Sequence, residues 1–207
     1  EDFGLQENAL LPHLDLKDEK VAKQILSIIK SGKEESIYDE SLRLYAKSSY
    51  YFSSGKYYEA DKHFSKYLRN PGFRDHNEII YYNYLLSAVK AQLPPVIRAL
   101  RARLYLNNSY EQKHGQKVMI QLMTAYYDME LWDEALNAAQ NIFTNEMKRL
   151  GTEKGDYQAD DEFLLAVARI GQSYSRLKGA DKQAKAYSLF NTYAQQFASS
   201  PHAVNIY

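Results

Sequence analysis

The 207-residue chain contains no cysteine. Without a thiol it can form no disulfide scaffold, no thiolate metal site and no cysteine nucleophile. The absence leaves the compartment open, because a cysteine-free chain suits an oxidising periplasm and a reducing cytosol equally well.

The chain also lacks an excess of either charge. Its 26 Lys and Arg residues balance 26 Asp and Glu residues, although a quarter of the chain (25%) is charged. A net charge of zero provides no overall attraction to nucleic acid or to an anionic membrane. The totals do not exclude a local charged patch.

Long apolar runs are missing as well. The segment 79–89, IIYYNYLLSAV, is one of the longest, and it is about half of the roughly 20 residues that span a bilayer. We therefore expect no membrane insertion by this chain. It begins at Glu1 rather than Met, so a signal peptide, a lipid-attachment site or a further domain would lie before residue 1.

Catalytic and metal-binding motifs do not occur. The histidines are scattered without an HExxH or other short ligand spacing: His13, His63, His76, His114 and His202. There is no GxSxG, GxxxxGK[ST] or GxGxxG motif, and the polar loop 151–160 follows neither phosphate-loop nor EF-hand spacing. We expect no enzyme activity, no cofactor and no metal, and the role of this loop stays open.

Basic and aromatic residues alternate in 98–108, RALRARLYLNN, which invites comparison with nucleic-acid-binding surfaces. On a helix Arg98 and Arg101 share a face, whereas Arg103 points well away from them. Because no continuous basic stripe forms, we predict no nucleic-acid partner and a solvated outer face for these arginines.

Glycine and proline are sparse, at 9 and 5 residues, and they fall between segments of helical period. Val21, Ile25, Ile28 and Ile29, for example, recur at helical spacing before Gly32. No segment alternates as a strand would. The pattern predicts an all-α chain of antiparallel helical hairpins, with helices at 18–31, 35–53, 57–68, 77–91, 95–106, 116–129, 132–150, 161–177 and 182–197.

Two of these hairpins repeat one another. The segments 44–64 and 119–139 align without a gap, which places Tyr57 on Trp132 and Ala60 on Ala135. A third copy, 167–190, fits if about three residues are inserted at the turn, and the unit 78–108 is counted from its length. A small Ala lets the two helices approach closely, and large aromatic residues fill the space between successive hairpins.

The repeated unit resembles the tetratricopeptide (TPR) repeat. Gly55, Tyr57, Ala60 and Phe64 reproduce its turn and second helix, although Met123 takes a place that is usually small and Ala139 replaces Phe64. The resemblance implies a right-handed superhelix of about four repeats plus an N-terminal helix. It divides the chain into an extension at 1–33 and a repeat domain at 34–207, with repeats at 41–74, 78–108, 116–150 and 161–199 and a further helix starting at 200–207.

TPR proteins hold partner segments in a concave groove formed by the first helix of each repeat. The resemblance implies that the groove-facing residues here include Tyr45, Ser49, Phe52, Thr124, Tyr127, Asp128, Gln172 and Arg176. This set lacks the Lys, Arg and Asn clamp with which TPR co-chaperones hold a carboxylate tail. The implied partner is therefore a protein or peptide segment of another kind.

The C-terminal run 187–207, YSLFNTYAQQFASSPHAVNIY, is similar to a pattern in bacterial envelope TPR lipoproteins of the outer-membrane assembly and Tol-Pal-associated types. Phe190, Phe197, Pro201 and Tyr207 fit that pattern, and Ala198 replaces its usual proline. The resemblance implies a non-enzymatic scaffold that assembles or positions a cell-envelope complex, in the periplasm or at the outer membrane. The alternative is a cytoplasmic regulatory or motility adaptor domain of a larger protein; an upstream lipobox cysteine would favour the first, a fused domain the second.

Overall fold

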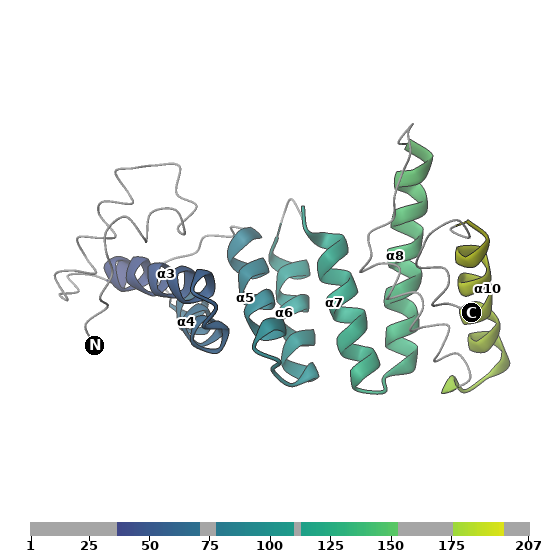
Figure 1. The fold of residues 1–207 in the computed structure, drawn as a ribbon, viewed down its shortest axis with the longest axis horizontal. Coiled ribbons are helices and arrows are strands. Elements are labelled where there is room, and N and C mark those ends of the chain that lie inside the picture. Colours follow the sequence, from purple (N-terminus) through teal and green to yellow (C-terminus); the bar gives the residue numbers. More distant parts are fainter. Residues whose placement is uncertain (1–36, 71–77, 110–112, 153–175, 197–207) are drawn as a thin grey trace. The chain divides into compact units, whose positions relative to one another are not determined.

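The computed structural model describes residues 37–70, 78–109, 113–152 and 176–196. This part of the chain is entirely helical, with no strand, so the all-α prediction is confirmed there (Figure 1). The helices are α3 (Ile37–Ser53), α4 (Tyr57–Arg69), α5 (Glu78–Lys90), α6 (Pro95–Asn108), α7 (Gly115–Asp128), α8 (Trp132–Thr152) and α10 (Ala180–Gln196). Each lies within about two residues of a predicted helix. The helices predicted at 18–31 and, except for its last two residues, at 161–177 lie outside the described residues.

Three helix-to-helix turns have the same backbone geometry. Gly55, Gln92 and Glu130 have φ values of 74°, 52° and 59°, which lie in the left-handed region. In each turn this residue donates its N–H to the carbonyl three positions back, and the next residue donates to the carbonyl five positions back, with distances of 2.9–3.1 Å. This is the Schellman arrangement that ends a helix and satisfies its last carbonyls. The turn therefore recurs even after α5, where the sequence motif is weak.

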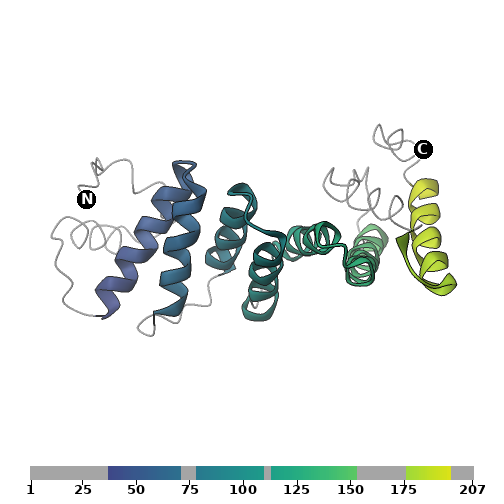
Figure 2. The same cartoon turned by 90° about the horizontal axis from the view of Figure 1, so that it is seen from below.

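The chain divides into two compact units. The first unit holds α3, α4 and α5, and α4 packs against both of the others. Figure 2 shows α3 and α4 running side by side. Phe64 and Tyr84 are buried and their ring centroids are 6.2 Å apart, which joins α4 to α5. Ala60 is 0% exposed, as expected for the small residue that lets paired helices approach closely.

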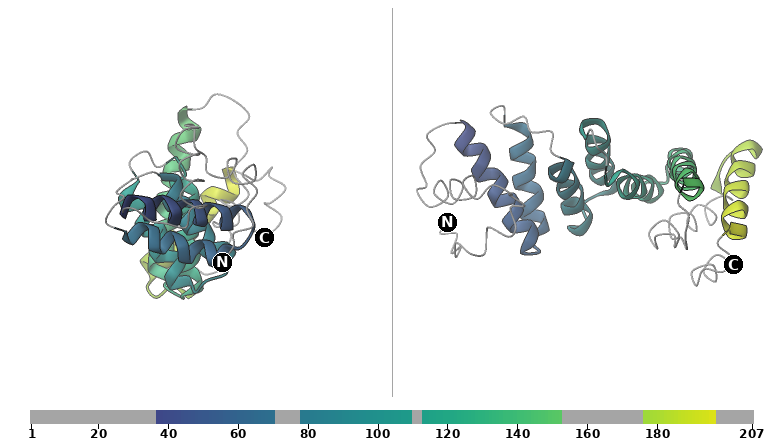
Figure 3. Two further views of the ribbon diagram at one scale, coloured as in Figure 1. Left: turned by 90° about the vertical axis from the view of Figure 1, so that its left-hand side faces the viewer. Right: turned by 90° about the horizontal axis from the view of Figure 1, so that it is seen from above.

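The second unit includes most of α6 together with α7, α8 and α10. α7 packs along α8, and α8 also contacts α10 (Figure 3). Ala135 is buried at the start of α8, in the same repeat position as Ala60. Met123 is buried in the position that holds the buried Ser48 in α3, so this place in the repeat accepts side chains of different size.

Candidate partner-binding surface

The predicted groove residues of the first unit lie on α3 at helical spacing. Tyr45 and Phe52 are half-buried, and the Tyr45 ring lies 5.6 Å from that of Tyr67. Ser49 is only 5% exposed, which leaves little of its side chain for a partner. On the predicted groove face of α3, the two aromatic side chains are therefore more exposed than the hydroxyl of Ser49.

Phe52 also meets the first residue of α4. The ring centroids of Phe52 and Tyr57 are 5.6 Å apart, and the ring planes meet at 72°, which is an edge-to-face contact. The residues are five apart in sequence, but the Schellman turn folds the chain back between them. The turn thus brings the two rings together and leaves Phe52 half-buried, with part of its ring at the surface.

The same pair occurs at the turn from α7 to α8. Tyr127 and Trp132 are again five residues apart, with ring centroids separated by 5.2 Å and planes at 84°. Tyr127 and the predicted groove residue Thr124 are both half-buried. The two units therefore display equivalent aromatic pairs, which we call the turn pairs: Phe52 with Tyr57, and Tyr127 with Trp132.

Charged residues at the end of a repeat's first helix contact the second helix of the preceding repeat. The ammonium of Lys90 lies 5.5 Å from the ring centroid of Tyr57, and the guanidinium of Arg176 lies 5.3 Å from that of Trp132. Asp128 forms an ion pair with Arg98 at 2.7 Å. Lys90 lies two positions before Gln92, and Asp128 lies two positions before Glu130, the residues with left-handed backbone conformation. The sequence alignment of the hairpins puts Arg176 in the equivalent position.

Two of the predicted groove charges therefore make contacts within the second compact unit. Asp128 accepts a hydrogen bond from Arg98, and Arg176 covers the indole that Tyr127 also touches. Lys90 was not among the predicted site residues; the signal that could have found it is its repeat register with Asp128. Gln172 lies outside the described residues.

The arginines of α6 are not the purely solvated set that the sequence led us to expect. Arg98 pairs with Asp128, and the guanidinium of Arg103 donates to the hydroxyl of Tyr126, with Nε at 2.8 Å. That guanidinium also lies 5.5 Å from the Tyr126 ring centroid. Arg98 and Arg103 thus hold α6 against α7.

His63 on α4 is the titratable residue with the most distinctive surroundings. Its ring stacks on that of Tyr51 with centroids 5.2 Å apart, and its buried Nδ1 has no hydrogen-bond partner among the described residues. Burial lowers the pKa of the imidazole, and the nearby Lys47 and Lys66 lower it further. His63 is therefore held towards its neutral form.

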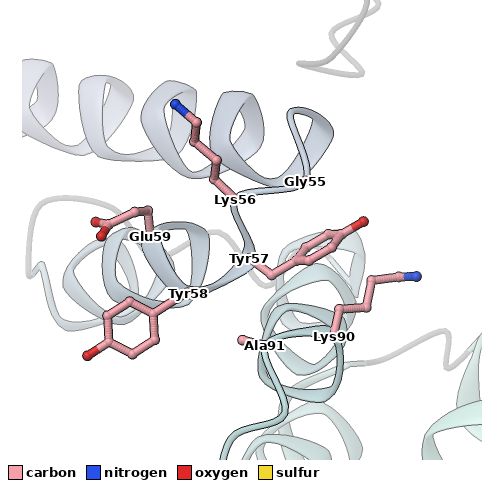
Figure 4. Close-up of a pocket in the computed structure, with 7 residues that line it drawn as sticks. All are labelled: Gly55, Lys56, Tyr57, Tyr58, Glu59, Lys90 and Ala91. Carbon is pink, nitrogen blue, oxygen red and sulfur yellow. The ribbon is translucent and has the colours of Figure 1, made fainter.

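An open pocket lies beside the turn between α3 and α4. It has a volume of about 370 Å³ and is lined by Gly55, Lys56, Tyr57, Tyr58, Glu59, Lys90 and Ala91. Figure 4 shows these side chains spreading around the start of α4 and the end of α5. We call this hollow the turn pocket.

Other kinds of site find no support in the part of the chain that is described. Residues 37–70, 78–109, 113–152 and 176–196 hold no group of three His, Asp or Glu side chains placed to bind a metal ion. None of the helices there is both long and apolar enough to cross a membrane.

No family model matches the sequence, and no curated protein or solved structure matches the chain.

Proposed function

We propose that this chain is a TPR-like, right-handed helical solenoid that acts as a non-enzymatic scaffold and binds a protein segment in a concave groove. The observation that supports this proposal best is that the same helix-to-helix turn, with the same kind of aromatic contact, occurs in both units. A Schellman turn at Gly55 and at Glu130 lies between the two rings of a turn pair in each case. Such recurrence of a hairpin unit is the property that defines repeat proteins.

The turn pairs also offer the kind of surface that proteins use for recognition. Phe52 and Tyr127 are half-buried, so part of each ring reaches the surface, and each ring is in edge-to-face contact with a second ring. Rigid aromatic residues lose little conformational entropy on binding and are enriched among the residues that dominate interface energies. Because the contacts already orient both rings, a partner would find them preorganised.

The cellular setting of the proposal rests on the C-terminal run 187–207, whose pattern is similar to envelope TPR lipoproteins. On that basis the partner complex belongs to a bacterial cell envelope, and the protein works in the periplasm or at the outer membrane. The alternative of a cytoplasmic adaptor domain predicts a fused domain before residue 1. The full-length N-terminus distinguishes the two.

A pull-down with single-residue variants tests the groove. Phe52→Ala and Tyr127→Ala each remove one ring that is partly exposed, so we expect each variant to recover less of the partner that wild-type protein captures from a source-cell extract. Tyr187→Ala is the matched control, because it removes an exposed ring from α10 outside the predicted groove. Circular dichroism establishes that all three remain folded. Full retention of every partner by folded Phe52→Ala and Tyr127→Ala would refute the groove.

A further inference from the structure

Each turn pair is contacted by a cation that lies further along the chain. In the first unit the ammonium of Lys90, at the end of α5, is 5.5 Å from the Tyr57 ring centroid, and Tyr57 in turn contacts Phe52. Figure 4 shows the side chains of Tyr57 and Lys90 extending to the same side, away from Tyr58. The contacts therefore run from a ring on the predicted groove face, through a ring at the start of the second helix, to a cation.

The second unit has the same three-part arrangement. The guanidinium of Arg176 lies 5.3 Å from the Trp132 ring centroid, and Trp132 contacts Tyr127. Lys90 and Arg176 are both exposed, so neither cation is held in place by burial. We call these arrangements the ring–cation triads: Phe52, Tyr57 and Lys90 in the first unit, and Tyr127, Trp132 and Arg176 in the second.

The turn after α5 shows what replaces the cation where the two rings are missing. Val89 and Pro94 stand there in the sequence places of the rings, before and after the left-handed Gln92. In the place of the cation, at the end of α7, the chain has Asp128, which pairs with Arg98 of α6 at 2.7 Å. A cation therefore contacts each helix that starts with an aromatic ring, and a carboxylate contacts the helix that carries an arginine near its start.

We propose that Lys90 and Arg176 are positioning residues for the partner-binding groove. Each cation holds the turn pair of the preceding hairpin, so that the groove-facing ring is oriented before a partner binds. This inference rests on the proposed scaffold function and adds what orients its binding residues. A cation over an aromatic ring is attracted by the negative face of the ring, and at an exposed site this contact favours the seated ring roughly two- to fivefold. Binding at one hairpin thus depends on a residue of the next.

Nuclear magnetic resonance of the whole chain tests the second triad without any partner. Trp132 is the only tryptophan of the sequence, so its indole N–H gives a single signal, and the Tyr127 ring signals are those that disappear in Tyr127→Leu. We expect Arg176→Met to shift the indole signal and to move the Tyr127 ring signals towards those of a free tyrosine. The population of displaced rings should rise roughly two- to fivefold.

Two further variants separate the effect of the cation from a general effect of substitution. Arg176→Lys keeps the positive charge and should restore most of the wild-type signals, whereas Arg176→Met keeps only an apolar chain. Lys178→Met removes an exposed cation two residues away, and we expect it to leave both sets of signals almost unchanged. Unmoved Tyr127 signals in Arg176→Met, or equal movement in Lys178→Met, would overturn the inference.

The pull-down extends the test to binding through the first triad. Lys90→Met should lower the recovery of the partner, by less than Phe52→Ala does, and Lys90→Arg should restore it. Lys62→Met is the matched control, because it removes an exposed cation from α4, and it should leave the recovery unchanged. An equal loss in Lys62→Met would show that net charge and not the ring contact decides the recovery, which would also overturn the inference.

The two experiments distinguish a failure of the inference from a failure of the proposed function. Loss of partner by Phe52→Ala together with unmoved Tyr127 signals in Arg176→Met would reject the positioning role and leave the proposed function standing. Signals that move as expected, together with full retention of every partner by Phe52→Ala and Tyr127→Ala, would reject the groove and with it the binding role of both cations.

Discussion

Gly55 and Glu130 occupy the same left-handed position in two hairpin turns, so exchanging their residue types tests the turn geometry. Gly55 has a φ of 74° and Glu130 a φ of 59°. Glycine adopts this conformation freely, whereas a side chain at this position is strained. We predict that Gly55→Ala destabilises its hairpin and that Glu130→Gly stabilises its own.

The expected size of each effect follows from the backbone. A Cβ added at Gly55 would meet no atom within 4 Å. The loss of stability in Gly55→Ala therefore comes from the left-handed backbone conformation and not from a steric clash. That conformation costs a non-glycine residue roughly 1–2 kcal/mol, part of which is offset because alanine restricts the unfolded chain. We expect Gly55→Ala to lower the free energy of unfolding by about 1 kcal/mol, and Glu130→Gly to raise it by up to about the same amount.

Native-state hydrogen exchange read by mass spectrometry resolves the two hairpins, because Gly55 and Glu130 belong to different compact units. Amides of α4 should exchange about fivefold faster in Gly55→Ala, and amides of α8 should exchange more slowly in Glu130→Gly. Unchanged exchange in α4 would refute the left-handed turn at residue 55. A loss larger than about 3 kcal/mol would show that steric contact, and not backbone strain, dominates.

Two further predictions concern α4. Phe64 is fully buried and packs against Tyr84, so Phe64→Ala should lower the free energy of unfolding, measured in urea, by about 3–5 kcal/mol. Phe64→Leu keeps most of the side-chain volume and should lower it much less. Equal losses in the two variants would contradict this packing. The pKa of His63 is lowered in the folded protein, so the unfolded state binds the proton more readily. The contribution of His63 therefore leaves the free energy of unfolding highest above the unfolded pKa near 6.5. The free energy of unfolding falls as the pH drops through that value towards the folded pKa. His63→Gln should reduce the loss of stability between pH 7.5 and pH 5.5, and an unchanged pH profile would exclude this role.

Much of the secondary structure could be predicted because helix ends depend on local chemistry. Gly55 favours the left-handed cap, and Pro95 suits the first turn of α6. The apolar spacing of the intervening residues specifies a helix of known length. These signals act over a few residues, so they are readable from the sequence, and the described helices follow them closely.

Whether an individual aromatic side chain is buried or exposed depended on tertiary structure. Among the tyrosines of the segment 49–71, Tyr67 is 2% exposed, Tyr58 is 64% exposed and Tyr50 is half-buried. A helix has several faces, and a sequence does not say which of them a neighbouring helix covers. Burial of Ser49 on the predicted groove face has the same origin.

The candidate site, too, could be predicted from the sequence only in part. The resemblance to the TPR repeat predicted Phe52 and Tyr127 as groove residues, and the structure shows that each contacts the aromatic residue five positions later. The resemblance could not show that Asp128 pairs with Arg98, that Arg176 covers Trp132 or that Lys90 lies beside Tyr57. Those contacts join side chains far apart in the chain, and only the packing of one hairpin against the next brings them together.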